Sequence, residues 1–218
     1  MSILKEIQKE IAPFNAQLVA VSKTKPNEQI LELYREGQRV FGENRVQELV
    51  KKEAVLPKDI KWHMIGHLQS NKVKYIAPFI DLIHSVDSLK LLKEINKQGK
   101  KNDRIISCLL EFKIGKEEAK AGLSINEGHS LLTSIQKDIL PFVQIKGVMG
   151  MASFSNDKDQ VRAEFRQLKN IFEEIKSHYF QMDLSFAIIS MGMSGDYPIA
   201  LEEGSTMVRI GTKLFGQR

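Results

Sequence analysis

The chain has 218 residues, of which 42% are hydrophobic and 27% charged, a composition typical of globular proteins and unlike that of disordered ones. This length is enough for one substantial core, so we expect a single domain spanning residues 1–218. The net charge of +5 is spread along the chain, and the densest basic cluster, within 97–104, is interrupted and has no aromatic residue nearby, which argues against a nucleic-acid-binding protein.

The first fourteen residues, MSILKEIQKEIAPF, alternate Lys and Glu with Ile and Leu. This pattern predicts an amphipathic helix and not the apolar run of a signal peptide. The longest apolar stretches of the chain are strand-sized, so we expect no membrane span. The one cysteine, Cys108, excludes an internal disulfide framework and lies in the apolar run IISCLL. We therefore expect a cytoplasmic protein with a buried, unreactive thiol.

Short β-rich runs recur along the rest of the chain, separated by segments with helical spacing. Most are continuously apolar, as expected for parallel strands that are covered on both faces. The predicted strands are 17–22, 39–42, 61–66, 81–86, 104–112, 143–150, 184–192 and 206–211.

The segments between these strands read as helices. Within 157–177 the apolar residues recur every three or four positions and form one stripe. Within 88–98, Ser88 or Asp87 can cap a helix that begins at Leu89. Pro26 stands where a first helical turn should begin after the first strand.

Eight strands alternating with helices, preceded by one extra N-terminal helix, predict an α/β fold of the (β/α)8 TIM-barrel type. A doubly wound open sheet is the alternative, and the count of eight favours the barrel. Active sites of such barrels lie at the carboxyl ends of the strands. Polar and glycine residues gather there at 22–25, 42–44, 66–67, 192–195 and 211–212.

Lys23 directly follows the first predicted strand. Its amine would lie at the barrel mouth beside apolar walls, and Lys25 places a second cation two residues away. Both surroundings favour the neutral amine, which is the form that makes a Schiff base with an aldehyde. The alternative is that Lys23 and Lys25 are two solvated lysines leading into a helix.

The loops after the seventh and eighth strands carry small residues. Gly192, Ser194 and Gly195 lie in the first loop, and Gly211 and Thr212 lie in the second. Such residues let backbone N–H groups approach an anion closely, and these two loops are a frequent phosphate site in barrels. Alternatively, the glycines only make tight turns.

Arg209 lies in the apolar run of the eighth strand, so its guanidinium needs a buried acceptor. That acceptor could be a phosphate, a ring nitrogen, or a carboxylate such as Glu43. His63 and His67 are spaced as metal ligands on a helix would be, but WHMIGH reads as a strand followed by a loop, so we predict no metal site.

Four segments resemble the pyridoxal phosphate homeostasis proteins, which are related in fold to the barrel domain of alanine racemase. They are VSKTKP (21–26), FGENRVQE (41–48), WHMIGHLQSNK (62–72) and the block 190–216, and the resemblance runs in order over residues 17–216. One departure is Lys120-Ala121-Gly122, where many relatives have a polar residue in the middle.

The resemblance implies pyridoxal 5′-phosphate as cofactor. Lys23 is similar to the family's Schiff-base lysine, and Asn44 matches a residue that lines the pocket. Arg209 matches an arginine near the pyridine nitrogen or the phosphate. The matches to the phosphate-binding segments are Ser194, Gly211 and Thr212.

Alanine racemases add a second domain that supplies a catalytic tyrosine, and we expect this chain to have none. Of its four tyrosines, only Tyr197 could stand near the site, and surface packing suits it better. We therefore expect a non-catalytic, monomeric carrier that holds the cofactor and releases it to apo-enzymes. A weak amino-acid racemase is the alternative, and a basic RNA-associated protein is a third hypothesis.

Overall fold

The structure is a computed structural model that describes residues 2–115 and 122–216. Its eight strands are all parallel to their neighbours and form a closed barrel in chain order, completed by pairing of the last strand with the first. The strands are β1 (Gln17–Val21), β2 (Val40–Glu43), β3 (Lys61–Met64), β4 (Leu82–Val86), β5 (Ile106–Phe112), β6 (Val143–Gly150), β7 (Ile188–Ser190) and β8 (Met207–Ile210).

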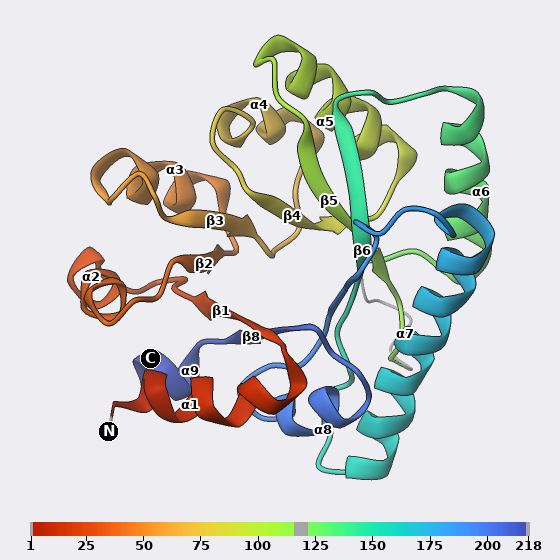
Figure 1. Cartoon of the computed structure of the whole chain (residues 1–218). Helices are drawn as coiled ribbons and strands as arrows, with labels where there is room; N and C mark the ends of the chain where they lie inside the picture. The colour runs from red at the N-terminus through yellow and green to blue at the C-terminus, as the bar shows by residue number, and fades with distance from the viewer. Residues whose placement is uncertain (1, 116–121, 217–218) are drawn as a thin grey trace.

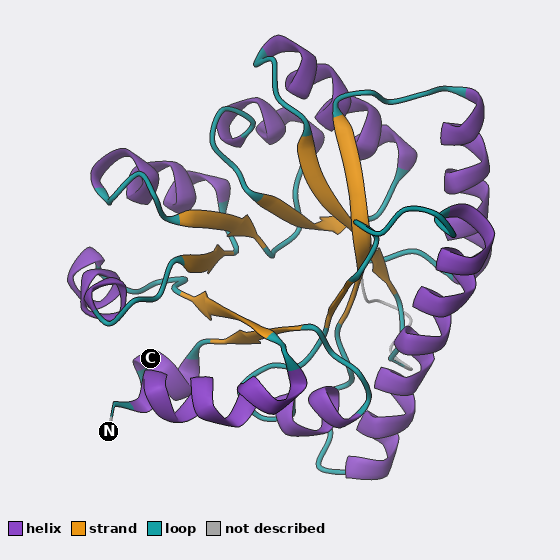
Figure 2. Cartoon of the chain, viewed as in Figure 1, coloured by secondary structure: helices purple, strands orange, loops and turns teal. Residues whose placement is uncertain are grey.

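Helices surround the barrel on its outside (Figures 1 and 2). They are α1 (Ile3–Ile11), α2 (Asn27–Arg35), α3 (Val46–Val55), α4 (Val73–Ile76), α5 (Leu89–Lys101), α6 (Ile125–Lys137), α7 (Lys158–Tyr179), α8 (Tyr197–Glu202) and α9 (Thr212–Phe215), with short 3-10 turns at Ala12–Phe14 and Ser70–Lys72. The predicted barrel and its additional N-terminal helix, α1, are confirmed.

The predicted helix starts are set by side-chain caps. Ser88 accepts a hydrogen bond from the backbone N–H of Leu91, so Ser88 and not Asp87 caps α5. Asp157 caps α7 in the same way. Each such cap satisfies a backbone N–H that would otherwise have no partner within the helix. The sequence predicts Pro26 in the first turn of a helix. In the structure it is the N-cap residue, one position before α2 begins.

The strand predicted at 184–192 is much shorter in the structure, where β7 begins only at Ile188. The cause is a local turn in which the Asp183 carboxylate accepts hydrogen bonds from the N–H and the hydroxyl of Ser185. Leu184 lies in that turn and is exposed. Asp and Ser side chains commonly divert the backbone from a ladder in this manner.

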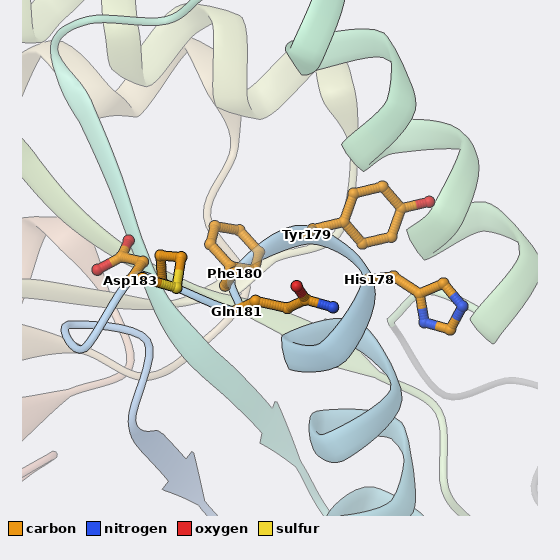
Figure 3. Close-up of a pocket in the computed structure, with 6 residues that line it drawn as sticks. His178, Tyr179, Phe180, Gln181 and Asp183 are labelled. Carbon is orange, nitrogen blue, oxygen red and sulfur yellow. The ribbon is translucent and has the colours of Figure 1, made fainter.

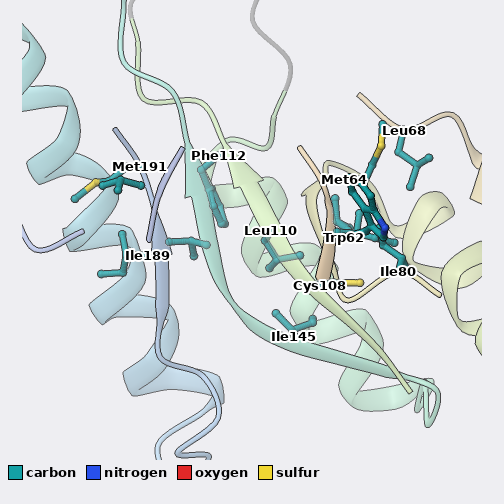
Figure 4. Packing of buried hydrophobic residues seen from close by; sticks show 14 of the residues in the cluster. Trp62, Met64, Leu68, Ile80, Cys108, Leu110, Phe112, Ile145, Ile189 and Met191 are labelled. Atoms are coloured by element: carbon teal, nitrogen blue, oxygen red, sulfur yellow. The ribbon is translucent and has the colours of Figure 1, made fainter. Parts of the chain in front are cut away.

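Two apolar clusters fill the molecule. The larger lies between the strands and the helices and includes Trp62, Cys108 and Leu110 (Figure 4). Cys108 is fully buried there, and burial raises the pKa of its thiol, which agrees with an unreactive cysteine. The smaller cluster lines the barrel interior, and its buried members are Val19, Val40, Leu82, Leu109, Met149 and Met207.

Successive residues of a strand point to opposite faces, so residues two positions beyond the interior cluster also point inward. On β4, β5 and β8 these are His84, Glu111 and Arg209. Ser190 holds the same relation to Ile188 on β7. On β4, β5, β7 and β8 the interior is therefore apolar near the amino ends of the strands and polar near their carboxyl ends.

No helix among residues 2–115 and 122–216 has the length and apolar character needed to cross a membrane.

Candidate functional site

Lys23 lies in the turn that follows β1, and a buried ionic cluster fixes that turn from the outside of the barrel. The Ser22 hydroxyl donates to the Glu43 carboxylate over 2.6 Å. The Lys52 ammonium of α3 donates to the Ser22 carbonyl at 2.7 Å and to Glu43 at 2.7 Å. It also donates to Glu48, whose carboxylate accepts the N–H of Thr24 at 2.6 Å. The residues on both sides of Lys23 are thus tied to one buried cation.

The backbone of the Lys23 turn is itself unusual. Thr24 has a φ of 65°, in the left-handed region that a β-branched residue rarely adopts. The hydrogen bond to Glu48 holds it there. Lys25 donates to the carbonyls of Phe215 at 3.0 Å and Gly216 at 3.2 Å. Its ammonium is therefore engaged with the end of α9.

The loops after β7 and β8 meet beside β1. Ser194 accepts a hydrogen bond from the N–H of Gly211 over 3.2 Å, which links the two loops. Gly211 packs on Val21, and a Cβ at this glycine would lie 3.3 Å from that of Val21. Ser194, Gly211 and Thr212 are therefore brought together next to the strand that leads to Lys23.

Gly192 shapes the first of these loops. Its φ is +94°, and a Cβ there would lie 2.6 Å from the Cβ of Ala200. We expect Gly192→Ala to lower the free energy of unfolding by about 2 kcal/mol or more through backbone strain and overpacking. Gly195→Ala is the matched control, because nothing lies within 4 Å of its added Cβ. Urea unfolding of both variants measures the difference, and equal losses would contradict this explanation.

Asn44 follows β2 on the other side of Lys23. A cavity of about 250 Å³ at the carboxyl ends of β2 and β3 is lined by Asn44, Arg45, Val46, Gln47, His67, Gln69 and Lys72. Gly66 packs so closely on the Asn44 backbone that an added Cβ would lie 2.5 Å from its carbonyl oxygen. The predicted residue thus borders a recess on the face where the strands end.

A wider depression of about 620 Å³ lies elsewhere, between the end of α7 and the start of β7, and is lined by residues 178–183 (Figure 3). It opens at the amino end of a strand, the face of a barrel that does not carry active sites. We therefore place the candidate site at the opposite face, around Lys23.

Arg209 is buried in the barrel, with 4% of its surface exposed. It donates to the Ser190 hydroxyl over 2.6 Å and to the Gly150 carbonyl over 3.1 Å. Burial lowers the pKa of Arg209 to about 10, which leaves the guanidinium charged at neutral pH. Its predicted alternative pairing with Glu43 is wrong. Gly42 faces the barrel interior, so Glu43 faces outward, where Lys52 holds it.

The histidines have partners other than a metal. His63 contacts His84 and Asp81, whereas His67 lies 3.5 Å from the Asp87 carboxylate. His84, Ser190 and Glu111 were not predicted as part of the interior. His84 and Ser190 each end an apolar run two positions after an apolar residue, Leu82 and Ile188, and this spacing is the signal that could have placed them on the interior face.

Glu111 stands on the interior face near Arg209 and Asp87. Burial raises its pKa to about 7, with the Asp87 charge adding to the effect and Arg209 opposing it. A raised folded-state pKa gives stability that is present below the unfolded pKa and is lost as the pH rises through the folded pKa. Here that window runs from pH 4.5 to about 7.

Glu111→Gln removes this titration. We expect the variant to gain about 3 kcal/mol relative to the parent protein between pH 4 and pH 8. Urea unfolding at the two pH values measures the change. A difference between the two proteins that does not vary with pH would show that Glu111 ionises normally.

Lys120 and Ala121, where the sequence departs from the family pattern, lie outside the described residues.

A family model described as the N-terminal domain of alanine racemase matches residues 4–218. A pyridoxal phosphate homeostasis protein of Aquifex aeolicus (strain VF5) is 42% identical over 204 residues, which cover 93% of this chain and 87% of the relative. Two structures of PipY from Synechococcus elongatus PCC7942, one without PLP and one with PLP bound, are 37% identical and cover 98% of both chains, with TM-scores of 0.91 and 0.88.

Alanine racemase from Bartonella henselae has a TM-score of 0.72 at 17% identity and covers 99% of this chain and 57% of its own. That likeness concerns the fold alone.

Proposed function

Because the chain belongs to the pyridoxal phosphate homeostasis proteins and to the alanine racemase N-terminal domain family, we propose that it binds pyridoxal 5′-phosphate (PLP) as a Schiff base on Lys23. The observation that carries the proposal is the fixed turn of Lys23 beside the joined loops after β7 and β8. The amine of Lys23 would condense with the cofactor's aldehyde and release one water. The PLP-bound structure of the PipY relative supports this proposal.

The phosphate would bind to Ser194, Gly211 and Thr212. A glycine at 211 gives an anion close access to backbone N–H groups, and the hydroxyls of Ser194 and Thr212 add donors. Ser194 Oγ accepts the N–H of Gly211, which fixes the hydroxyl between the two loops and leaves its proton to donate. A phosphate would therefore find donors from two loops that are held together before it arrives.

Arg209 would meet the pyridine ring, and Asn44 would line the pocket on the β2 side. Arg209 carries its charge on a guanidinium that has no acceptor capacity. An arginine at the ring nitrogen leaves that nitrogen unprotonated, so the cofactor supplies a poorer electron sink than it does beside a carboxylate. This choice of residue suits storage of the cofactor better than demanding carbanion chemistry.

Three of the four tyrosines bond groups that give no support to a racemase. A two-base racemase needs an acid–base group facing Lys23 across the substrate. The Tyr197 hydroxyl instead contacts Glu10 and Lys213 on the outside of the barrel. Those of Tyr34 and Tyr179 bond Asp59 and His129. We therefore propose a non-catalytic carrier that holds PLP in the cytoplasm and transfers it to apo-enzymes.

The test is a visible absorbance spectrum of the purified protein, followed by borohydride reduction and peptide mapping by mass spectrometry. We expect a yellow protein with the reduced adduct on Lys23. A protein that stays colourless and unmodified after addition of PLP would overturn the proposal. Transfer of PLP to an apo-enzyme without turnover then supports a carrier, whereas exchange of an amino acid's Cα hydrogen with solvent deuterium that depends on Lys23 would identify a racemase.

A further inference from the structure

A continuous line of hydrogen bonds crosses the barrel interior from Arg209 to Asp81. Arg209 Nη1 lies 2.6 Å from Ser190 Oγ, and Ser190 Oγ lies 3.0 Å from His84 Nδ1. His84 Nε2 lies 2.9 Å from His63 Nδ1, and His63 Nε2 lies 3.3 Å from Asp81 Oδ2. We call these five residues the interior chain. They come from β8, β7, β4, β3 and the residue directly before β4.

The members of the interior chain differ in exposure. Ser190 and His84 are fully buried, His63 is 1% exposed and Arg209 4%. The Asp81 side chain is 47% exposed. Asp81 precedes β4 and so lies at the amino ends of the strands, whereas Arg209 approaches the carboxyl end of β8. The interior chain therefore runs from the basal surface of the barrel to the candidate site.

When Asp81 is ionised and both histidines are neutral, each hydrogen bond in this line has only one possible donor and one possible acceptor. His63 must donate from Nε2 to the Asp81 carboxylate, so its Nδ1 accepts. His84 must then donate from Nε2 and accept at Nδ1. The Ser190 hydroxyl donates to that nitrogen, and its oxygen accepts from Arg209. All donors point toward Asp81, and a line with one polarity strengthens each of its bonds.

The surroundings agree with these charge states. Burial lowers the pKa of both His63 and His84, and His84 is further disfavoured as a cation by His63 and Arg209. The hydrogen bond from His63 lowers the pKa of Asp81. The carboxylates that face Arg209 are Glu111 and Asp196. At the other end, the charges of Lys61 and Lys146 further lower the pKa of Asp81.

We propose that Ser190, His84 and His63 are positioning residues that transmit the fixed charge of Asp81 to Arg209 and so set how the guanidinium meets the cofactor ring. This inference rests on the proposed function, because it takes Arg209 to contact PLP. Ser190 and Gly150 accept from two N–H groups of the guanidinium and so fix its orientation, and its remaining donors can meet the ligand. The basal surface of the barrel is thereby coupled to the cofactor site.

Asp81→Asn tests the coupling, because Asp81 is half-exposed and its replacement leaves the buried members intact. An asparagine can accept from His63 or donate to it, so both polarities of the line become possible. Asp59→Asn is the matched control. Asp59 is also acidic and exposed near the start of a strand, but it pairs with Arg39 and Tyr34 and not with a residue of the interior chain.

The first readout uses the cofactor-free protein, in which nitrogen-15 NMR reports which ring nitrogen of each histidine carries the proton. We expect His63 and His84 to be neutral and protonated on Nε2 at pH 7.5. We expect mixed tautomers at both rings in Asp81→Asn and unchanged rings in Asp59→Asn. A charged His84, or one protonated on Nδ1, would overturn the inference whatever the protein does with PLP.

The second readout is the affinity and visible spectrum with PLP. We expect Asp81→Asn to weaken PLP binding by about fivefold and to shift the absorbance maximum, and Asp59→Asn to do neither. If the parent protein binds PLP and Asp81→Asn equals it in affinity and spectrum, the positioning role fails while the proposed function stands. If the parent protein binds no PLP, the proposed function fails and the role toward a cofactor fails with it.

Discussion

Lys23→Ala is expected to abolish the visible absorbance of the PLP-loaded protein and its borohydride-stable adduct. Without the amine, only the phosphate and ring contacts remain, so we expect the dissociation constant for PLP to rise about 100-fold, equivalent to roughly 2.7 kcal/mol. The measurements are absorbance after incubation with PLP, equilibrium dialysis and intact-protein mass after reduction. The fold should persist, because Lys23 lies in a turn after β1 and outside the strands.

Lys25→Ala is the matched control for this variant. Its ammonium bonds the Phe215 and Gly216 carbonyls, so its loss should loosen the end of α9 and leave the adduct on Lys23. A Lys23→Ala protein that stays yellow, with a reduced adduct on another lysine, would show that the anchor has been misassigned.

Lys52→Met is expected to lower the free energy of unfolding by about 3–5 kcal/mol, the usual cost of removing one partner from a buried ion pair. The Lys52 side chain is 7% exposed and that of Glu43 is fully buried. Burial raises the pKa of Glu43 and the charge of Glu48 adds to that effect, whereas Lys52 and Ser22 oppose it. Without Lys52 the carboxylate would be left without a compensating charge. Urea unfolding at pH 7 measures the loss.

Two further variants test whether the loss in Lys52→Met comes from a buried ion pair. Lys93→Met removes a surface pair with Asp138 whose side chains are 50% and 66% exposed, and we expect a loss of less than about 1 kcal/mol. Adding Glu43→Gln to Lys52→Met should recover much of the stability, because the uncompensated carboxylate is gone. A Lys52→Met protein as stable as Lys93→Met would contradict a buried pair.

Lys52→Met should also affect the candidate site. Lys52 also bonds the Ser22 carbonyl and Glu48, and Glu48 accepts the N–H of Thr24. Release of that turn frees the backbone on both sides of Lys23. We therefore expect faster loss of PLP from Lys52→Met than from Lys93→Met under conditions where both are folded.

Much of the fold could be predicted because it depends on local patterns. Continuous apolar runs give buried parallel strands, and the count of eight distinguishes the barrel from an open sheet. The strand predicted at 184–192 is too long, because apolar character alone does not reveal that the Asp183 side chain makes a turn with Ser185. Helix starts such as that at Leu89 follow from one capping residue and were predictable.

The candidate site was predictable only where the chemistry of a residue and its position along a strand coincide. Lys23, Ser194 and Gly211 lie in the loops that follow β1, β7 and β8, so the barrel itself brings them near one another. In the sequence, Lys52 cannot be distinguished from a surface helix lysine that stands four residues after a glutamate. Its burial depends on Glu43, which faces outward from a different strand. The interior chain depends likewise on registers between distant strands, such as that of His63 with Leu82.

The pairing of β1 with β8 also bears on how the protein is made. Gln17 lies opposite Met207 in that ladder, so the barrel closes across almost the whole length of the chain. Contacts between such distant residues form slowly, since most of the intervening chain must already be ordered. Gly211 meets Val21 only after this step. A nascent chain on the ribosome would therefore bring the loops of its candidate site together only late in folding.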